Sequence, residues 1–235
     1  MNFLSIFDVI GPNMIGPSSS HTAGAVSIAL MARKMFPEDI KKVTFTLYGS
    51  FAKTYHGHGT DRALLGGILG FSTDDERIRD AFQIAKDRNI TYEYIIDEKT
   101  ATEHPNTADI DLIGVTGHTL SIRGESIGGG KMKIVRINNI DVEFTGEYST
   151  LIVQQKDTPG VVAHITQALS EQEVNIAFMR LFREDKGANA YTVVESDEPI
   201  PEAVLDKIKT NPHVSDLMLI QMWEGLVWIF LPDKN

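Results

Sequence analysis

The order of elements in the last third of the chain is the feature that constrains the fold most. Apolar periodicity predicts a strand, a helix, two strands joined by a tight turn, a second helix and a final strand. This βαββαβ order is the plan of a ferredoxin-like domain, which belongs to the α+β class. The six segments, in chain order, are 148–155, 161–172, 175–184, 188–196, 201–210 and 213–222.

The residues before this region also alternate helices with strands, which predicts a separate α/β domain. Helices are predicted at 23–36, 60–71 and 74–88, and strands at 42–48, 91–97, 108–115, 118–123, 131–137 and 142–145. Gly49 and Ser50 are expected only to break the first strand, and 126–130 is expected to be a flexible connector.

The predicted boundary lies near Gly146, so the domains are expected at 1–146 and 147–222, followed by a tail at 223–235. The apolar stretch 222–231 at the start of that tail holds both tryptophans of the chain. We expect it to pack on its own domain, although an apolar segment of this kind could instead bind a partner chain.

Composition excludes several classes of function. The 235 residues carry a formal charge of −10 and no cysteine, and no run of lysine or arginine stands out. Binding to nucleic acid or to an anionic membrane needs a basic surface, so neither partner is expected. Without cysteine, the chain cannot form a disulfide or hold a cysteine-ligated cluster. The start MNFLSIFDVIGPN lacks a secretory pattern, and the apolar stretch near the end is too short to span a bilayer, so we expect a cytoplasmic protein.

The motif GPSSSHTAG, residues 16–24, immediately precedes a predicted helix. It could be only a loop in which the hydroxyl of Ser19 or Ser20 caps that helix. One cap needs one serine, however, and the free N–H groups at a helix start attract an anion such as a carboxylate. The second interpretation is therefore an anion site, with hydroxyls around the ligand and His21 beside it.

The motif HGHGTDR, residues 56–62, also precedes a predicted helix, with Thr60 or Asp61 as the expected cap. Histidine titrates near neutral pH, so His58 could act as a general base or acid. The alternative is a glycine-rich loop with surface histidines. A His-x-His pair without a third ligand is weak support for a metal site.

Two further motifs leave a structural and a functional interpretation open. The glycines of SIGGG, residues 126–130, could surround an anion with N–H groups, but a hinge is favoured from these residues alone. The stretch DTPGV, residues 157–161, opens a helix and could form ordinary turn chemistry or a pocket for an amino acid. No GxGxxG follows a strand, and no Walker A pattern is present.

Together, GPSSSHTAG, GHGTDRALLGG and SIGGGKM resemble the β chain of the bacterial iron–sulfur L-serine dehydratases. The stretch DTPGVVAHITQALSEQEVNI resembles the start of an ACT domain, and the resemblance covers essentially all of residues 1–222. One departure is Ala25, where this family often has proline. The first domain is also similar to the allosteric substrate-binding domain of some phosphoglycerate dehydrogenases.

The resemblance implies conversion of L-serine to pyruvate and ammonia. It also implies a [4Fe-4S] cluster, carried by an α chain, that acts as a Lewis acid for the leaving hydroxyl. We favour His58 as the base and His21 as a positioning or acid partner, with Thr60 orienting one of them. The expected substrate-binding residues are Ser18, Ser19, Ser20, Thr22, Gly128 and Gly129.

In the ACT domain the expected effector residues are Asp157, Gly160, Val161, Asn175 and Ile176. The domain would bind serine, another amino acid or a potassium ion, or it would only self-associate, sheet edge to edge or helix to helix, which an exposed strand edge favours. The rival hypotheses for the whole chain are a non-catalytic amino-acid-sensing protein and a purely structural or regulatory subunit.

Overall fold

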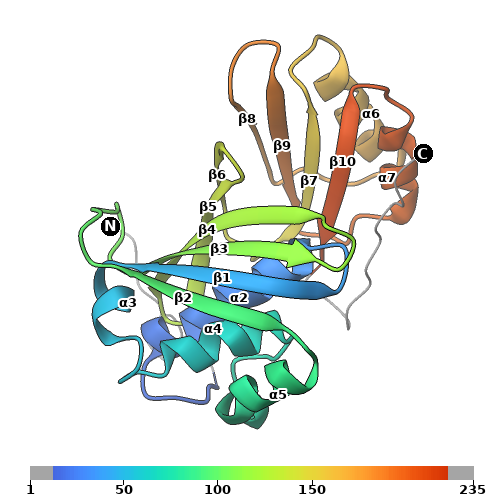
Figure 1. Cartoon of the computed structure of the whole chain (residues 1–235). Coiled ribbons are helices and arrows are strands. Elements are labelled where there is room, and N and C mark those ends of the chain that lie inside the picture. The colour runs from blue at the N-terminus through green and yellow to red at the C-terminus, as the bar shows by residue number, and fades with distance from the viewer. Residues whose placement is uncertain (1–12, 222–235) are drawn as a thin grey trace, which may run out of the picture. The chain divides into compact units, whose positions relative to one another are not determined.

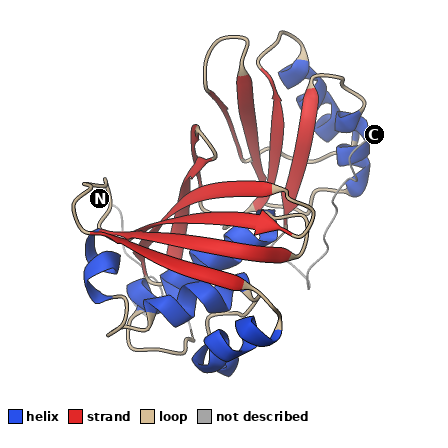
Figure 2. Cartoon of the chain, viewed as in Figure 1, coloured by secondary structure: helices blue, strands red, loops and turns tan. Residues whose placement is uncertain are grey.

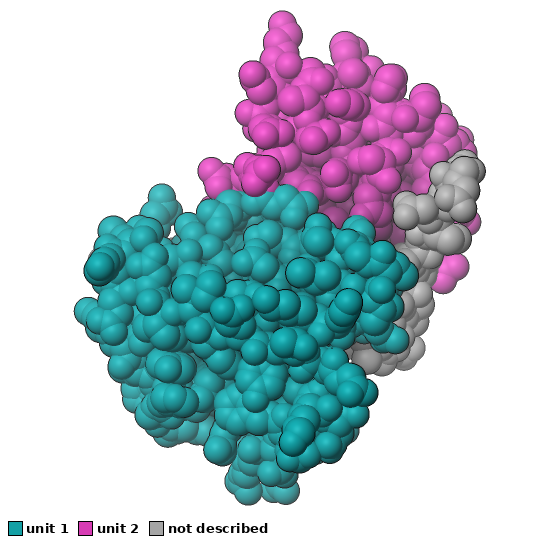
Figure 3. All heavy atoms as spheres, in the orientation of Figure 1, with its two compact units in different colours: residues 1–138 teal, residues 139–235 magenta. Residues whose placement is uncertain are grey.

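The computed structural model describes residues 13–221, which form two compact units that divide between Asn138 and Asn139 (Figure 3). The strand Ile140–Phe144 lies between this point and the predicted boundary near Gly146. The domain limits of 1–146 and 147–222 therefore stay a prediction. The predicted tail at 223–235 lies outside the described residues. Within residues 13–221, no helix has the length and apolar character that crossing a membrane requires.

Five strands of the first unit form a mixed sheet in the order β2-β1-β3-β4-β5 (Figure 1). Only β1 and β2 are recorded as parallel, whereas β1 with β3, β3 with β4 and β4 with β5 are antiparallel. The chain divides into its two units at the turn before β6. The five strands are β1 (Ile40–Tyr48), β2 (Thr91–Asp97), β3 (Thr107–Gly114), β4 (Thr119–Gly128) and β5 (Lys131–Ile137), and β6 (Ile140–Phe144) falls in the second unit.

Helices cover one face of this sheet because alternate strand residues are apolar (Figure 2). Val43, Phe45 and Leu47 of β1 are fully buried, and Ile28 and Leu64 are fully buried helix residues of the same core. The helical segments are the π-helix η1 (Ser19–Ala23), α2 (Gly24–Met35), α3 (Gly49–Thr54), α4 (Thr60–Ile68), the 3-10 helix η2 (Glu76–Asp80) and α5 (Ala81–Asp87).

Three predictions for this unit are wrong in detail. Gly49 and Ser50 do not merely end β1 but begin α3, with Gly49 at a φ of +53°. The predicted helix 74–88 is two segments, because Asp75 caps a short 3-10 helix before α5 begins. Residues 126–130 are not a flexible connector but the end of β4 and its turn into β5.

The second unit has the predicted βαββαβ order, so the ferredoxin-like α+β fold is confirmed. Its four-stranded antiparallel sheet has the order β10-β7-β9-β8. Helices α6 and α7 pack on a core that includes Leu151, Val194 and Leu217. The elements are β7 (Ser149–Lys156), α6 (Val161–Glu171), β8 (Phe178–Arg183), β9 (Asn189–Ser196), α7 (Glu202–Lys209) and β10 (Val214–Ile220).

Candidate functional site

The first histidine motif starts with an unusual helical turn. Residues Ser19–Ala23 form a π-helix, and its N-cap is Ser18, whose Oγ accepts a hydrogen bond from the His21 N–H at 3.1 Å. The prediction that Ser19 or Ser20 is the cap is therefore wrong. The hydroxyls of Ser19 and Ser20 make no hydrogen bond within residues 13–221. Single π-helical turns occur often at functional sites.

In the second histidine motif, a glycine stands directly before α4. Gly59 is the N-cap, with a φ of +69°, so the predicted cap at Thr60 or Asp61 is wrong, although Asp61 Oδ1 accepts a hydrogen bond from the Arg62 N–H at 2.8 Å. The hydroxyl of Thr60 instead donates to the main-chain oxygen of His21 at 2.9 Å. In return, Thr22 donates to the main-chain oxygen of His58 at 3.1 Å. Each motif thus fixes the backbone of the other motif's histidine.

These two hydrogen bonds bring the imidazoles of His21 and His58 together, with ring centroids 4.8 Å apart and a tilt of 55°. His21 Nε2 lies 2.8 Å from the hydroxyl of Ser50, which can donate or accept according to the imidazole tautomer. The edge of Phe51 contacts His21 at 5.5 Å between centroids. Sequence reasoning missed Ser50, although a Gly-Ser pair directly after a buried strand is a signal that could have found it.

Both histidines are half-buried, and burial affects the protonation of His21. Burial, and then the neighbouring His58, lower the pKa of His21, so its neutral imidazole is favoured. The Nδ1 atom of His58 is buried and has no partner among the residues that the structure describes. A neutral imidazole with an unused nitrogen can accept a proton or a hydrogen bond from a ligand.

A cavity of about 550 Å³ opens beside His58. Gly16, Thr22 and His58 line it, together with the cationic side chains of Arg62 and Arg79. His21 and the three serines are not among its lining residues. The cavity therefore gives access to His58, whereas the three serines of the first motif do not line it.

The glycine motif packs against the second half of the first one, at Ser20 and Gly24. Gly128 and Gly129 have φ values of +101° and +61°, as the turn between β4 and β5 requires. Next to this turn, Ser126 Oγ donates to the main-chain oxygen of Ser20 at 2.9 Å. A Cβ atom added at Gly24 would collide with that same Ser126 hydroxyl. The structure thus brings the first three predicted motifs together in one unit.

The predicted effector residues of the second unit are arranged differently from expectation. The carboxylate of Asp157 accepts hydrogen bonds from Arg183 at 3.1 Å and from the Gly187 N–H at 3.2 Å, so it ties down the β8–β9 turn. Gly160 is the N-cap of α6, and Val161 is buried. Asn175 and Ile176 precede β8 instead of beginning it, and Asn175 is exposed.

The described part of the chain offers no group of three or more histidine, cysteine or acidic side chains that could hold a metal. His56 does not pair with His58 but with Asp61, at 2.8 Å between Nδ1 and Oδ2. Because the sequence has no cysteine, its residues do not fit a cluster of iron and sulfide.

Comparison with known proteins agrees with this arrangement. Residues 5–136 match the family model described as serine dehydratase beta chain, and residues 149–213 match the ACT domain model. The chain belongs to the serine dehydratase beta-chain family. This confirms the resemblance to this family that the sequence motifs indicated.

Two relatives match this beta-chain family member almost from end to end. A probable L-serine dehydratase beta chain of Bacillus subtilis (strain 168) is 40% identical over 214 residues, covering 91% of this chain and 96% of that protein. An L-serine dehydratase beta chain of Peptoniphilus asaccharolyticus is 43% identical over 209 residues, covering 88% and 94%. A D-3-phosphoglycerate dehydrogenase of Bacillus subtilis (strain 168) is 24% identical over 201 residues, covering 84% of this chain and 37% of that protein.

Proposed function

We propose that this chain is the β subunit of an L-serine dehydratase and supplies substrate-binding and acid–base groups for the conversion of L-serine to pyruvate and ammonia. The observation that carries the proposal is the pair of imidazoles 4.8 Å apart, beside serine hydroxyls that have no partner in the described chain. Its support from relatives is the near end-to-end match to two proteins named as L-serine dehydratase beta chains.

The serine-rich turn is the proposed site for the substrate carboxylate. Ser19 and Ser20 can donate their hydroxyl hydrogens, and the helical segment that starts there adds a partial positive charge. Ser18 and Thr22 hold the histidine motifs in place, since their hydroxyls already bond His21 N–H and His58 oxygen. The turn at Gly128 and Gly129 supports the cradle through the neighbouring Ser126.

His58 is the proposed base for the α-proton, because its Nδ1 has no partner in the described chain and the residue lines a cavity. Neutral His21, held by Ser50, positions the substrate or returns a proton. Thr60 acts as a positioning residue through the His21 backbone. Loss of the α-proton and of the β-hydroxyl, together one water, gives aminoacrylate, which water hydrolyses to pyruvate and ammonia.

We assign the iron–sulfur cluster to the α chain, since this chain has no cysteine for it. The active site is then assembled from two chains in the cytoplasm, and neither chain alone is active. Every step assigned above uses only the residues of this chain.

For the ACT domain, self-association through the edge strand β8 is the proposed role. Phe178 and Leu181 of this strand are 46% and 45% exposed, and an apolar edge strand requires a partner. Binding of serine or potassium near Asp157 and Gly160 is the alternative. Sedimentation across a concentration series tests association, and calorimetry with serine and with potassium tests the effector role.

Co-expression with a cysteine-bearing α chain tests the proposed function. The complex is reconstituted anaerobically with iron and sulfide, and pyruvate formation from L-serine is followed. We expect activity with both chains and none when either is omitted. Serine binding by this chain with no effect on the activity of any α chain would instead support an amino-acid sensor.

A further inference from the structure

The loop between β2 and β3, residues 98–106, is anchored to the histidine and serine site at two points. The Ser50 N–H donates to the Pro105 oxygen at 2.7 Å, and the Ser126 N–H donates to the Asn106 oxygen at 2.9 Å. Ser50 is the residue that bonds the His21 ring, and Ser126 is the one that bonds the Ser20 main chain. The end of this loop is therefore bonded to Ser50 and Ser126, and each of these serines in turn bonds a residue of the proposed substrate site.

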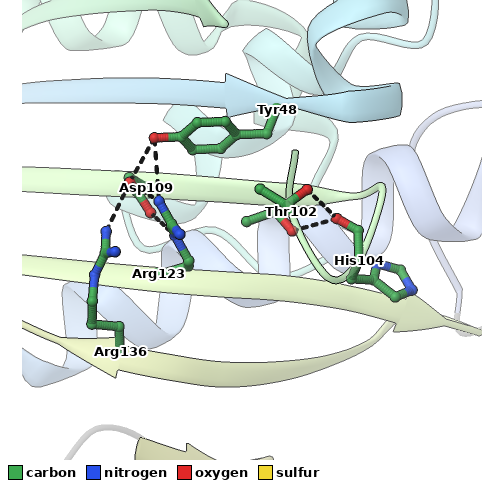
Figure 4. A network of polar contacts seen from close by, with 7 residues as sticks. Tyr48, Thr102, His104, Asp109, Arg123 and Arg136 are labelled. Carbon is green, nitrogen blue, oxygen red and sulfur yellow. Dashed lines mark hydrogen bonds and ion pairs between the residues drawn. The ribbon is translucent and has the colours of Figure 1, made fainter. Parts of the chain in front are cut away.

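Hydrogen bonds inside the loop hold this end rigidly. Thr102 and Thr107 both donate their hydroxyls to the main-chain oxygen of His104, at 2.7 and 2.6 Å (Figure 4). The Asn106 N–H donates to the His104 ring at 3.2 Å. A Cβ atom at Gly49 would come within 2.5 Å of the Pro105 oxygen, which shows how closely the loop approaches α3.

One polar atom at this end remains unused. The side-chain oxygen Oδ1 of Asn106 is buried and has no hydrogen-bond partner among residues 13–221. Both main-chain polar groups of the same residue are bonded, which fixes the backbone from which the amide extends. A buried polar atom without a partner is costly, and a ligand that donates a hydrogen bond to it would remove that cost.

We propose that Asn106 Oδ1 accepts a hydrogen bond from the α-ammonium group of the bound L-serine, an inference that rests on the proposed function above. The ligand's charges are complementary to the residues around the site. Its carboxylate needs donors, which Ser19 and Ser20 provide, and its ammonium group needs acceptors. The amide oxygen of Asn106 can only accept, so it suits the ammonium group and not the carboxylate.

This contact makes Asn106 a residue that determines specificity. A hydroxy acid of the same length that lacks the amino group would leave Oδ1 unpaired, just as it is without ligand. The site would thus favour an amino acid over a hydroxy acid, because a polar site rejects the analogue that cannot satisfy it.

The test compares L-serine with 3-hydroxypropanoate, which keeps the carboxylate and the hydroxyl and lacks the ammonium group. The enzyme assembled with its α chain carries the wild-type sequence, Asn106→Ala or Asn106→Asp. Glu103→Ala, an exposed change in the same loop, is the control. We measure KM for L-serine and the inhibition constant of 3-hydroxypropanoate. Thermal unfolding of each variant reports on folding.

We expect Asn106→Ala to raise KM for L-serine by roughly 10- to 100-fold, the scale of a lost hydrogen bond to a charged group. The inhibition constant of 3-hydroxypropanoate should stay within about twofold. Asn106→Asp keeps an acceptor, so the variant should still bind L-serine. Its binding of the anionic 3-hydroxypropanoate should weaken. Because aspartate has nearly the same shape, this variant decides the matter if the alanine variant does not fold.

Equal losses for both ligands in both variants, or no loss for either, would overturn the inference. Either result with an active wild-type complex leaves the proposed function intact and refutes only the contact with the ammonium group. A correctly assembled wild-type complex with no L-serine dehydratase activity would refute the proposed function and this inference with it.

Discussion

The Thr60 hydroxyl donates to the main-chain oxygen of His21 at 2.9 Å, and Thr60 is fully buried. This hydrogen bond joins two residues 39 positions apart in the sequence, one from each histidine motif. Thr22 makes the reciprocal contact to His58. The distance between the two imidazoles is therefore set by the backbone and by buried hydroxyls, and not by the rings alone.

Thr60→Val tests this relationship, because valine keeps the shape and removes the donor. We expect the free energy of unfolding to fall by roughly 1–3 kcal/mol, since the His21 oxygen loses its buried partner. Turnover by the assembled enzyme should fall as well. Thr119→Val, at an exposed site on β4, is the control for denaturant unfolding. Unchanged stability and turnover would show that the hydrogen bond has no positioning role.

Ser50→Ala removes the hydroxyl that lies 2.8 Å from His21 Nε2. We expect a fall in turnover of about tenfold or more, because the imidazole loses the group that fixes its orientation. The change in unfolding free energy should be small, since Ser50 is only half-buried. Ser215→Ala, at an exposed serine that bonds a main-chain oxygen, is the matched control. Equal turnover of the two variants would contradict the role of Ser50.

The lowered pKa of His21 predicts how stability depends on pH. Burial first, and then His58, disfavour the charged imidazole in the folded state, so the unfolded chain binds the proton more readily. The free energy of unfolding should therefore fall as pH drops below the ordinary histidine value of about 6.5. Denaturant unfolding at about pH 7.5 and pH 5.5 measures this loss. His21→Gln should lose less than the wild type, and parallel losses would contradict the prediction.

Asp109 of β3 binds two guanidinium groups, and Figure 4 shows them on neighbouring strands. Its carboxylate accepts from Arg123 at 2.6 and 2.7 Å, from Arg136 at 2.9 Å and from the Tyr48 hydroxyl at 2.9 Å. Asp109→Asn should lower the unfolding free energy by roughly 2–3 kcal/mol, because two cations lose their counter-charge. Arg136→Met should cost less than about 1 kcal/mol, since that side chain is partly exposed. The opposite order would contradict this account.

Much of the fold could be predicted from the sequence because its cues are local. The strand Thr91–Asp97 has the predicted limits, and the βαββαβ order of the second unit follows from alternating and helical patterns. The histidine motifs were found because each stands directly before a helix, where chain geometry puts side chains close to free N–H groups.

The features of the site that could not be predicted from the sequence depend on contacts between distant segments. Ser50 meets His21 only because a short helix follows β1, and Asn106 meets Ser126 only because β3 pairs with β4. The cap is Ser18, and not Ser19 or Ser20, because the first turn is π-helical. No residue pattern in the sequence indicates a π-helical turn. Such relationships come from tertiary packing, and local propensity does not encode them.

The turnover of His58→Ala and His21→Ala in the enzyme assembled with its α chain tests the central claim most directly. We expect each substitution to reduce pyruvate formation from L-serine by about 10²-fold or more, the usual scale for lost acid–base catalysis. The iron content and visible spectrum of each complex should match the wild type, because neither histidine is assigned to the cluster. Near-normal turnover by both variants, with the cluster intact, would contradict the account.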